Sequence, residues 1–275
     1  MNKNIIEGYF IDLDGTMIDK SDETGFLSQT NIMFLLNLQK IKPVIISTGR
    51  KPTGAVLKIM SMINSPYAVC STGSVVVDDK GKILNEILIK NQTKFKLFQF
   101  IMSQKLNFIV NGDKSIYHYG NEFNWNKREW VKRFNKTNYS AFDLEQNIRQ
   151  TLVFGANLNQ MAQLQKYINT HFSDLSTHVV SKGYSIEITD KNATKGIANK
   201  FVAKLLNIDI MNCAHIGDSR NDLLALPQTG YLVAMGNAEQ ELKEHAHFVG
   251  EEFNDGGLSK TIVKFEQFIN QKEIK

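Results

Sequence analysis

Cysteine and proline are scarce in this chain of 275 residues, which has two Cys and four Pro. Cys70 and Cys213 form neither a CxxC pair nor part of a ligand cluster, which excludes a disulfide framework and a zinc site of the usual spacing. No apolar run approaches the roughly 18 residues that cross a bilayer, and the first residues hold too short an apolar stretch for a signal peptide. We therefore expect a cytoplasmic protein without a membrane partner.

The composition is not that of a disordered chain. Apolar residues make up 42% of it and charged residues 22%, whereas there are 18 Gly and 4 Pro. The length corresponds to one or two domains at the usual size of about 150 residues each. The net charge of +4 is too small to indicate nucleic acid binding, so no nucleic acid partner is expected.

The charge is unevenly distributed. Residues 81–186 contain 14 Lys and Arg against 7 Asp and Glu, so this segment carries +7 and the remainder −3. One arrangement with this division is an acidic, metal-binding core that faces a basic lid over an anionic substrate. An ordinary solvated surface explains the same numbers equally well.

Short apolar runs that each end in a polar turn predict the first structural unit. Such runs lie at 8–11, 44–46 and 68–70, and again at 213–216 and 231–234. Helical spacing separates them at 32–38, where Ser28 is the expected N-cap, at 53–63 and at 195–206, and an amphipathic tail begins at Leu258. Alternating strands and helices predict an α/β fold with a doubly wound, Rossmann-like parallel sheet.

The pattern changes in the middle of the chain. Alternating stretches, a helix-like run at 93–102 and a region rich in aromatic residues indicate a separate α+β unit. We predict a core domain of residues 1–80 and 187–275, into which residues 81–186 are inserted.

The first candidate site is the sequence DLDGT, directly after the first apolar run. Asp12 and Asp14 stand two apart, so in extended geometry their side chains start on the same side of the backbone. Two carboxylates in one small site need a cation or a proton, which favours Mg2+ or a pair of unequal acids. Gly15 allows a tight turn whose N–H groups can face an anion. Taken alone, the pentapeptide also fits a surface turn.

Three further groups follow the same logic. Thr48, Gly49 and Arg50 end the second strand, where a hydroxyl and a guanidinium can bind a phosphoryl group, although a helix start explains them too. Lys195 precedes a predicted helix and can neutralise a phosphoryl oxygen, but such a lysine is usually a surface residue. Asp218, Asn221 and Asp222 follow a later strand. Because ligands bind at the carboxyl ends of parallel strands, we expect these groups to converge.

Taken together, these residues resemble the haloacid dehalogenase-like superfamily, in particular its Cof-type phosphatases. The matching motifs are DLDGT at 12–16, TGR at 48–50, Lys-Gly at 195–196 and GDSRND at 217–222, and later loops at 235–238 and 254–257 also match. The resemblance spans the chain and is strongest outside the insertion. Thr72 departs from it, because Asn is more usual there, which leaves a substrate contact at that loop open.

The resemblance implies a mechanism. Asp12 is the nucleophile that forms an aspartyl-phosphate, and Asp14 is the general acid and base, in an environment that favours its proton more than that of Asp12. Mg2+ is held by Asp12, the backbone carbonyl of Asp14, and Asp218. Thr48 and Lys195 hold the phosphoryl group.

The same resemblance assigns the remaining site residues. Gly15, Gly49, Arg50 and Asn221 join the phosphate site, and Asp222 orients Lys195 or a metal-bound water. The inserted unit is expected to close over the site and to select the leaving group. Candidates for contact with the organic part of the substrate are Trp125, Arg128, Trp130 and Lys132, although aromatic residues at such spacing more often pack a core.

The expected partner is a small phosphorylated metabolite, with sugar phosphates ahead of phosphorylated cofactors, and the expected assembly is a monomer or small homo-oligomer. Two alternatives stay open. A phosphomutase of the same superfamily shares these motifs. A nonenzymatic receiver-type signalling module uses similar residues, but in a different order and without an insertion. His118, His171, His178 and His215 lack metal-ligand spacing and are interpreted as structural or solvated.

Overall fold

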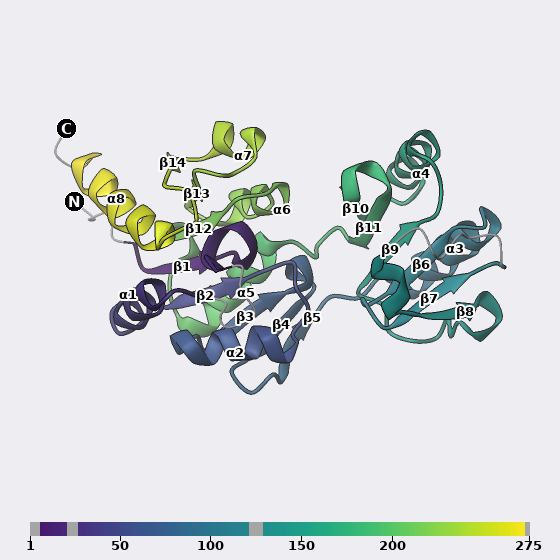
Figure 1. Ribbon diagram of the computed structural model, residues 1–275, viewed down its shortest axis with the longest axis horizontal. Helices are drawn as coiled ribbons and strands as arrows, with labels where there is room; N and C mark the ends of the chain where they lie inside the picture. Colours follow the sequence, from purple (N-terminus) through teal and green to yellow (C-terminus); the bar gives the residue numbers. More distant parts are fainter. Residues whose placement is uncertain (1–5, 21–26, 121–128, 273–275) are drawn as a thin grey trace. The chain divides into compact units, whose positions relative to one another are not determined.

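The computed structural model describes residues 6–20, 27–120 and 129–272 (Figure 1). The chain divides into two compact units: unit 1 comprises Met1–Glu86 and Ala193–Lys275, and unit 2 comprises Ile87–Asn192. Both junctions fall six residues after the predicted ones, because strand β5 (Ile83–Glu86) belongs to the sheet of unit 1 and strand β11 (Ser185–Asp190) belongs to that of unit 2. The pattern of apolar residues does not show to which sheet a strand pairs, so the sequence could not give these two boundaries.

The strands of unit 1 form one sheet in the order β14-β13-β12-β1-β2-β3-β4-β5. Strands from β14 to β3 pair in parallel, and β4 and β5 extend the sheet in antiparallel fashion. The predicted parallel α/β sheet is thereby confirmed. The other bounds are β1 (Gly8–Ile11), β2 (Val44–Ser47), β3 (Tyr67–Cys70), β4 (Val75–Asp78), β12 (Cys213–Gly217), β13 (Tyr231–Ala234) and β14 (Phe248–Val249).

Helices cover both faces of this sheet. The α-helices are α1 (Gln29–Gln39), α2 (Gly54–Ile63), α5 (Lys195–Leu206), α6 (Arg220–Leu223), α7 (Gln240–His245) and α8 (Gly257–Lys272). Shorter turns are η1 (Leu13–Met17), η2 (Ser71–Gly73), η7 (Ile210–Asn212) and η8 (Leu226–Gln228). Ser28 caps α1 as predicted, because its hydroxyl accepts the N–H of Asn31 at 3.2 Å.

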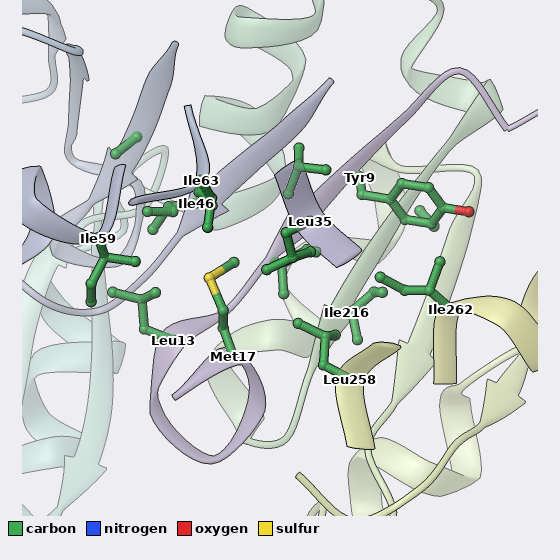
Figure 2. Packing of buried hydrophobic residues seen from close by; sticks show 14 of the residues in the cluster. Tyr9, Leu13, Met17, Leu35, Ile46, Ile59, Ile63, Ile216, Leu258 and Ile262 are labelled. Atoms are coloured by element: carbon green, nitrogen blue, oxygen red, sulfur yellow. The ribbon is translucent and has the colours of Figure 1, made fainter. Parts of the chain in front are cut away.

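Strand β1 lies at the centre of this packing. Successive side chains of a strand point to opposite faces. Tyr9 (Figure 2) and Ile11 therefore enter the cluster formed with α1, α2 and α8, whereas Phe10 enters the cluster formed with α5. All four residues of β1 are buried. Burial on both faces fixes the strand, and with it the position of Asp12 at its carboxyl end.

Unit 2 has its own sheet and its own core. The strand order is β10-β11-β9-β6-β7-β8, antiparallel except for the pair β7 and β8. The bounds are β6 (Asn107–Val110), β7 (Ser115–His118), β8 (Asn135–Asn138), β9 (Gln150–Phe154), β10 (Leu175–Val180), α3 (Asn91–Ser103), α4 (Leu158–His171), η4 (Glu129–Arg133), η5 (Tyr139–Ala141) and η6 (Ser181–Gly183).

The aromatic residues of unit 2 pack mainly against one another. Phe98 of α3 contacts Phe108 of β6 at a ring-centroid distance of 5.0 Å, and Trp130 contacts Phe154 at 5.3 Å. Trp130 is therefore part of a core, and Lys132 pairs with Glu129. Trp125 and Arg128 lie outside the described residues. In the described part of the chain, every helix falls short of the length or the apolar content that a bilayer crossing requires.

Candidate active site

The candidate site of unit 1 lies where three neighbouring parallel strands end. Strand β1 pairs with β12 on one side and with β2 on the other, and Ile11 lies opposite both Ile216 and Ile46. Asp12 follows β1, Thr48 follows β2 and Asp218 follows β12. Since parallel strands end at the same edge of a sheet, residues far apart in the chain are brought to one place.

Asp12 is buried and tightly held. Its backbone N–H donates to the carbonyl of Ile216 at 2.9 Å, and its Oδ1 accepts the Nζ of Lys195 at 2.7 Å. Gly15 completes the turn at a φ of +69°, and a Cβ at this position would overlap Oδ2 of Asp218. Glycine is required here both for the left-handed backbone and for the close approach to Asp218.

Three carboxylates form an acidic cluster. Each of Asp12, Asp218 and Asp222 offers one oxygen within 4.8 Å of the others. Burial, with repulsion from the neighbouring carboxylates, raises the pKa of Asp12 to about 7 despite the attraction of Lys195, and the pKa of Asp218 also to about 7. Hard oxygen donors that repel one another in a buried place are suited to a divalent cation such as Mg2+, so the donor set fits a metal site.

Asp222 has a different task within this cluster. Its Oδ1 accepts Lys195 Nζ at 2.6 Å and His215 Nε2 at 2.7 Å, and its Oδ2 accepts the N–H groups of Asp218 at 3.1 Å and Ser219 at 3.0 Å. A carboxylate has about four acceptor positions, all of which are used here. Burial would raise the pKa of Asp222, but Lys195 and His215 together hold it below its usual range. Asp12 and Asp218 are therefore the better metal ligands.

Lys195 connects two members of the cluster, Asp12 and Asp222. It is the first residue of α5, it has no exposed surface, and it bridges Asp12 and Asp222. Burial opposes its charge, but the two carboxylates outweigh burial and raise its pKa. The expected contact between Asp222 and Lys195 is thus present. An ammonium has three N–H donors, and the contacts given by the described residues use two of them.

Asp14 lies outside the buried cluster. Its side chain is 60% exposed and forms a bidentate ion pair with Arg50, at 2.8 Å from Nε and 2.6 Å from Nη2. Burial falls on Asp12 and not on Asp14, so the more proton-favouring environment of Asp14 stays a prediction that burial does not support. The separate expectation that Asp12 and Asp14 start on the same side of an extended backbone does not apply, because the chain enters η1 at Leu13, between the two aspartates.

The remaining predicted residues gather around Gly49. Thr48 is fully buried, and its Oγ1 accepts the N–H of Arg50 at 3.1 Å. A Cβ at Gly49 would lie 3.6 Å from Nδ2 of Asn221 and 3.7 Å from Oγ1 of Thr72. Asn221 is therefore close to the TGR turn, and Thr72 is close to it as well. The predicted site residues of unit 1 therefore lie at this edge of the sheet.

Residues that the sequence did not single out lie directly behind Asp222. His215 Nδ1 is 3.1 Å from Nδ2 of Asn199, whose Oδ1 accepts the Ser47 hydroxyl at 2.9 Å. His215 was interpreted as structural or solvated. Its burial between these partners fits a structural residue. The signal for the partners was its place inside the apolar strand 213–216, where a buried imidazole needs polar contacts.

Comparison with known proteins identifies proteins that are similar to this chain in sequence and fold. Residues 9–262 match the haloacid dehalogenase-like hydrolases. The chain is 24% identical to a phosphoglycolate phosphatase of Methanobrevibacter smithii, with 94% of this chain and 98% of the relative covered. It is 26% identical to the phosphatase YwpJ of Bacillus subtilis, with 87% and 92% covered. A solved sugar phosphatase of subclass IIB has a TM-score of 0.75 at 18% identity, with 94% and 99% covered.

These matches cover both units of the chain. The structural likeness supports the fold, and the matched hydrolases and phosphatases favour an enzyme over the receiver-type signalling module.

Proposed function

We propose that this chain, which belongs to the Cof-type branch of the haloacid dehalogenase-like hydrolases and is a phosphoric monoester hydrolase, is a Mg2+-dependent phosphatase of small phosphate monoesters. The observation that carries the proposal is that the Lys195 ammonium lies 2.7 Å from Asp12, which belongs to the acidic cluster with Asp218 and Asp222. A cation in this position favours the charged form of the nucleophile and neutralises an incoming phosphate.

Asp12 performs the first displacement. One of its carboxylate oxygens attacks phosphorus, and the bond between phosphorus and the ester oxygen breaks. Asp14, which must first leave its ion pair with Arg50 and take up a proton from water, gives that proton to the departing oxygen. In the second displacement Asp14 takes a proton from water while the water oxygen attacks phosphorus. The bond from phosphorus to Asp12 then breaks, which releases inorganic phosphate and restores both aspartates.

Several groups bind the phosphoryl oxygens during these steps. Lys195 supplies its third N–H, Thr48 supplies its hydroxyl proton, and the N–H groups of the turns at Gly15 and Gly49 face the anion. Asn221 contributes its amide. Arg50 binds both oxygens of Asp14 in the described structure, so we assign it to holding the carboxylate form that Asp14 has between the two displacements.

The residues that would hold Mg2+ are Asp12 and Asp218 through their carboxylates and Asp14 through its backbone carbonyl. When bound, the ion supplies positive charge that favours ionised carboxylates and a polarised phosphoryl oxygen. Asp222 stays outside this set because its oxygens are occupied by Lys195, His215 and two backbone N–H groups.

The proposed substrates are small phosphorylated metabolites, with sugar phosphates first. Support comes from the subclass IIB sugar phosphatase and from the phosphoglycolate phosphatase among the similar proteins. The basic excess of residues 81–186 suits an anionic substrate, and we assign the selection of the leaving group to this inserted unit. We further propose a cytoplasmic monomer or small homo-oligomer.

A panel of phosphate monoesters tests the proposal. Purified protein is assayed for inorganic phosphate with Mg2+, with chelator, and with Mg2+ restored, beside Asp12→Asn and a control, Asp79→Asn, at an exposed turn position. We expect Mg2+-dependent release in the wild type and the control, and none in Asp12→Asn. Equal release in chelator refutes the metal dependence, and turnover by Asp12→Asn refutes the nucleophile. Phosphate release without a bisphosphate activator separates the phosphatase from a phosphomutase.

A further inference from the structure

A line of polar side chains crosses an otherwise apolar layer behind the site. Ser47 ends β2, His215 lies in β12 and Asn199 lies in α5, and all three have no exposed surface. The cluster on this face of the sheet is apolar, with Phe10 and Ile45 among its members. Polar groups buried in such a place are costly unless each is hydrogen-bonded.

The hydrogen bonds along this line form an unbroken chain. Ser47 Oγ donates to Oδ1 of Asn199 at 2.9 Å, Nδ2 of Asn199 lies 3.1 Å from Nδ1 of His215, and Nε2 of His215 lies 2.7 Å from Oδ1 of Asp222. Lys195 Nζ contacts this same Oδ1 and Asp12. The line therefore leads from the interior to the nucleophile.

The chain has a definite direction. The Asp222 carboxylate is an acceptor, so the nitrogen that faces it, Nε2 of His215, must carry a proton. Burial disfavours a charged imidazole and lowers the pKa of His215, which leaves Nδ1 as an acceptor. Asn199 must then present its NH2 group to Nδ1 and its oxygen to the Ser47 hydroxyl. Each member thus fixes the orientation of the next.

We propose that His215, set in its Nε2–H form by Asn199 and Ser47, is a positioning residue that holds Asp222, and through it Lys195, against Asp12 for phosphoryl transfer. The inference rests on the proposed function. Backbone N–H groups hold Oδ2 of Asp222, but Oδ1 is shared by the side chains of Lys195 and His215. His215 is the contact that keeps Oδ1 in place, so the third N–H of Lys195 keeps one direction.

Two substitutions at the histidine separate positioning from packing. His215→Leu fills the space but donates nothing, whereas His215→Gln can place an N–H donor near the position of Nε2. We expect His215→Leu to lower kcat about 10- to 100-fold with little change in KM, and His215→Gln to recover most of this loss. His247→Leu is the control, since His247 accepts the N–H of Leu232 in the same unit and lies away from Asp222.

A spectroscopic measurement on the wild type does not depend on any variant folding. Imidazole 15N shifts should show His215 as the Nε2–H tautomer in the intact protein, and Asn199→Asp, which replaces the donor by an acceptor, should move the proton to Nδ1 or charge the ring. Either change should lower kcat. An Nδ1–H tautomer in the wild type overturns the proposal.

The kinetic outcomes are equally decisive. A wild type that releases no phosphate from any ester with Mg2+ refutes the proposed function itself. An active wild type with an unchanged kcat in His215→Leu refutes the positioning role alone. Equal losses in His215→Leu and His215→Gln also refute it, because they reveal packing without a need for the donor.

Discussion

Replacing Asp12, the proposed nucleophile, should stabilise the metal-free protein while abolishing its activity. The pKa of Asp12 is raised from 3.8 to about 7, first by burial and then by Asp222 and Asp218, against the attraction of Lys195. A carboxylate with a raised pKa is charged in the folded state at a cost. Each pH unit corresponds to about 1.4 kcal/mol, so the charge of Asp12 costs up to about 4 kcal/mol.

The pH window follows from the sign of this shift. Below about pH 4 Asp12 is protonated in the folded and unfolded states, and Asp12→Asn should match the wild type. Between about pH 4 and 7 the unfolded chain has released this proton and the folded protein retains it, so wild-type stability falls as pH rises. The advantage of Asp12→Asn should grow across this window and be complete above about pH 7.

Urea unfolding in chelator at a series of pH values measures the difference. At pH 8 we expect Asp12→Asn to exceed the wild type by up to about 4 kcal/mol, and Asp79→Asn to stay close to it. Mg2+ should reduce the difference, because a cation between Asp12 and Asp218 favours the charged wild type. An Asp12→Asn protein of equal or lower stability at pH 8, or a difference independent of pH, refutes the electrostatic reasoning.

Three further substitutions test neighbouring contacts. Lys195→Met leaves buried carboxylates without their cation and should lower the free energy of unfolding by about 3–5 kcal/mol at pH 8; urea unfolding checks this, and a loss below about 1 kcal/mol contradicts it. Gly15→Ala brings a Cβ onto Asp218 and should reduce kcat about 100-fold in the phosphate-release assay. An unchanged kcat contradicts this expectation, because it means that the turn accommodates the methyl group. Arg50→Met breaks a largely exposed pair with Asp14 and should cost less than about 1 kcal/mol in stability but lower kcat about tenfold; an unchanged kcat argues against Arg50 holding the acid.

The elements of unit 1 were predictable because their apolar runs are bounded by clear signals. Helix α5 spans Lys195–Leu206, as its spacing predicts, and Ser28 caps α1. Helix α4 was missed, although its N-terminus carried a signal. Asn157 and Gln160 form a capping box before Met161, Leu164 and Ile168, the buried side of a helix whose other side is polar.

The candidate site was predictable where each residue follows a strand directly. Asp12, Thr48 and Asp218 needed only the rule that parallel strands end at one edge. The network behind them was not accessible in this way. Ser47 and His215 lie on strands separated by β1, and Asn199 reaches them from a helix. No spacing in the chain connects these residues, so only the packed face of the sheet shows the contact.

The order of the strands has a consequence for how the polypeptide matures during synthesis. Strand β1 is made before both of its neighbours, and one of them, β12, follows it by about 200 residues. Unit 2 is continuous, and its paired strands lie within residues 87–192, so it can fold while the remainder is still being translated. The loop that carries Asp12 therefore lacks its neighbours Asp218 and Asp222 until both have been translated. The complete site can form only after that point in synthesis.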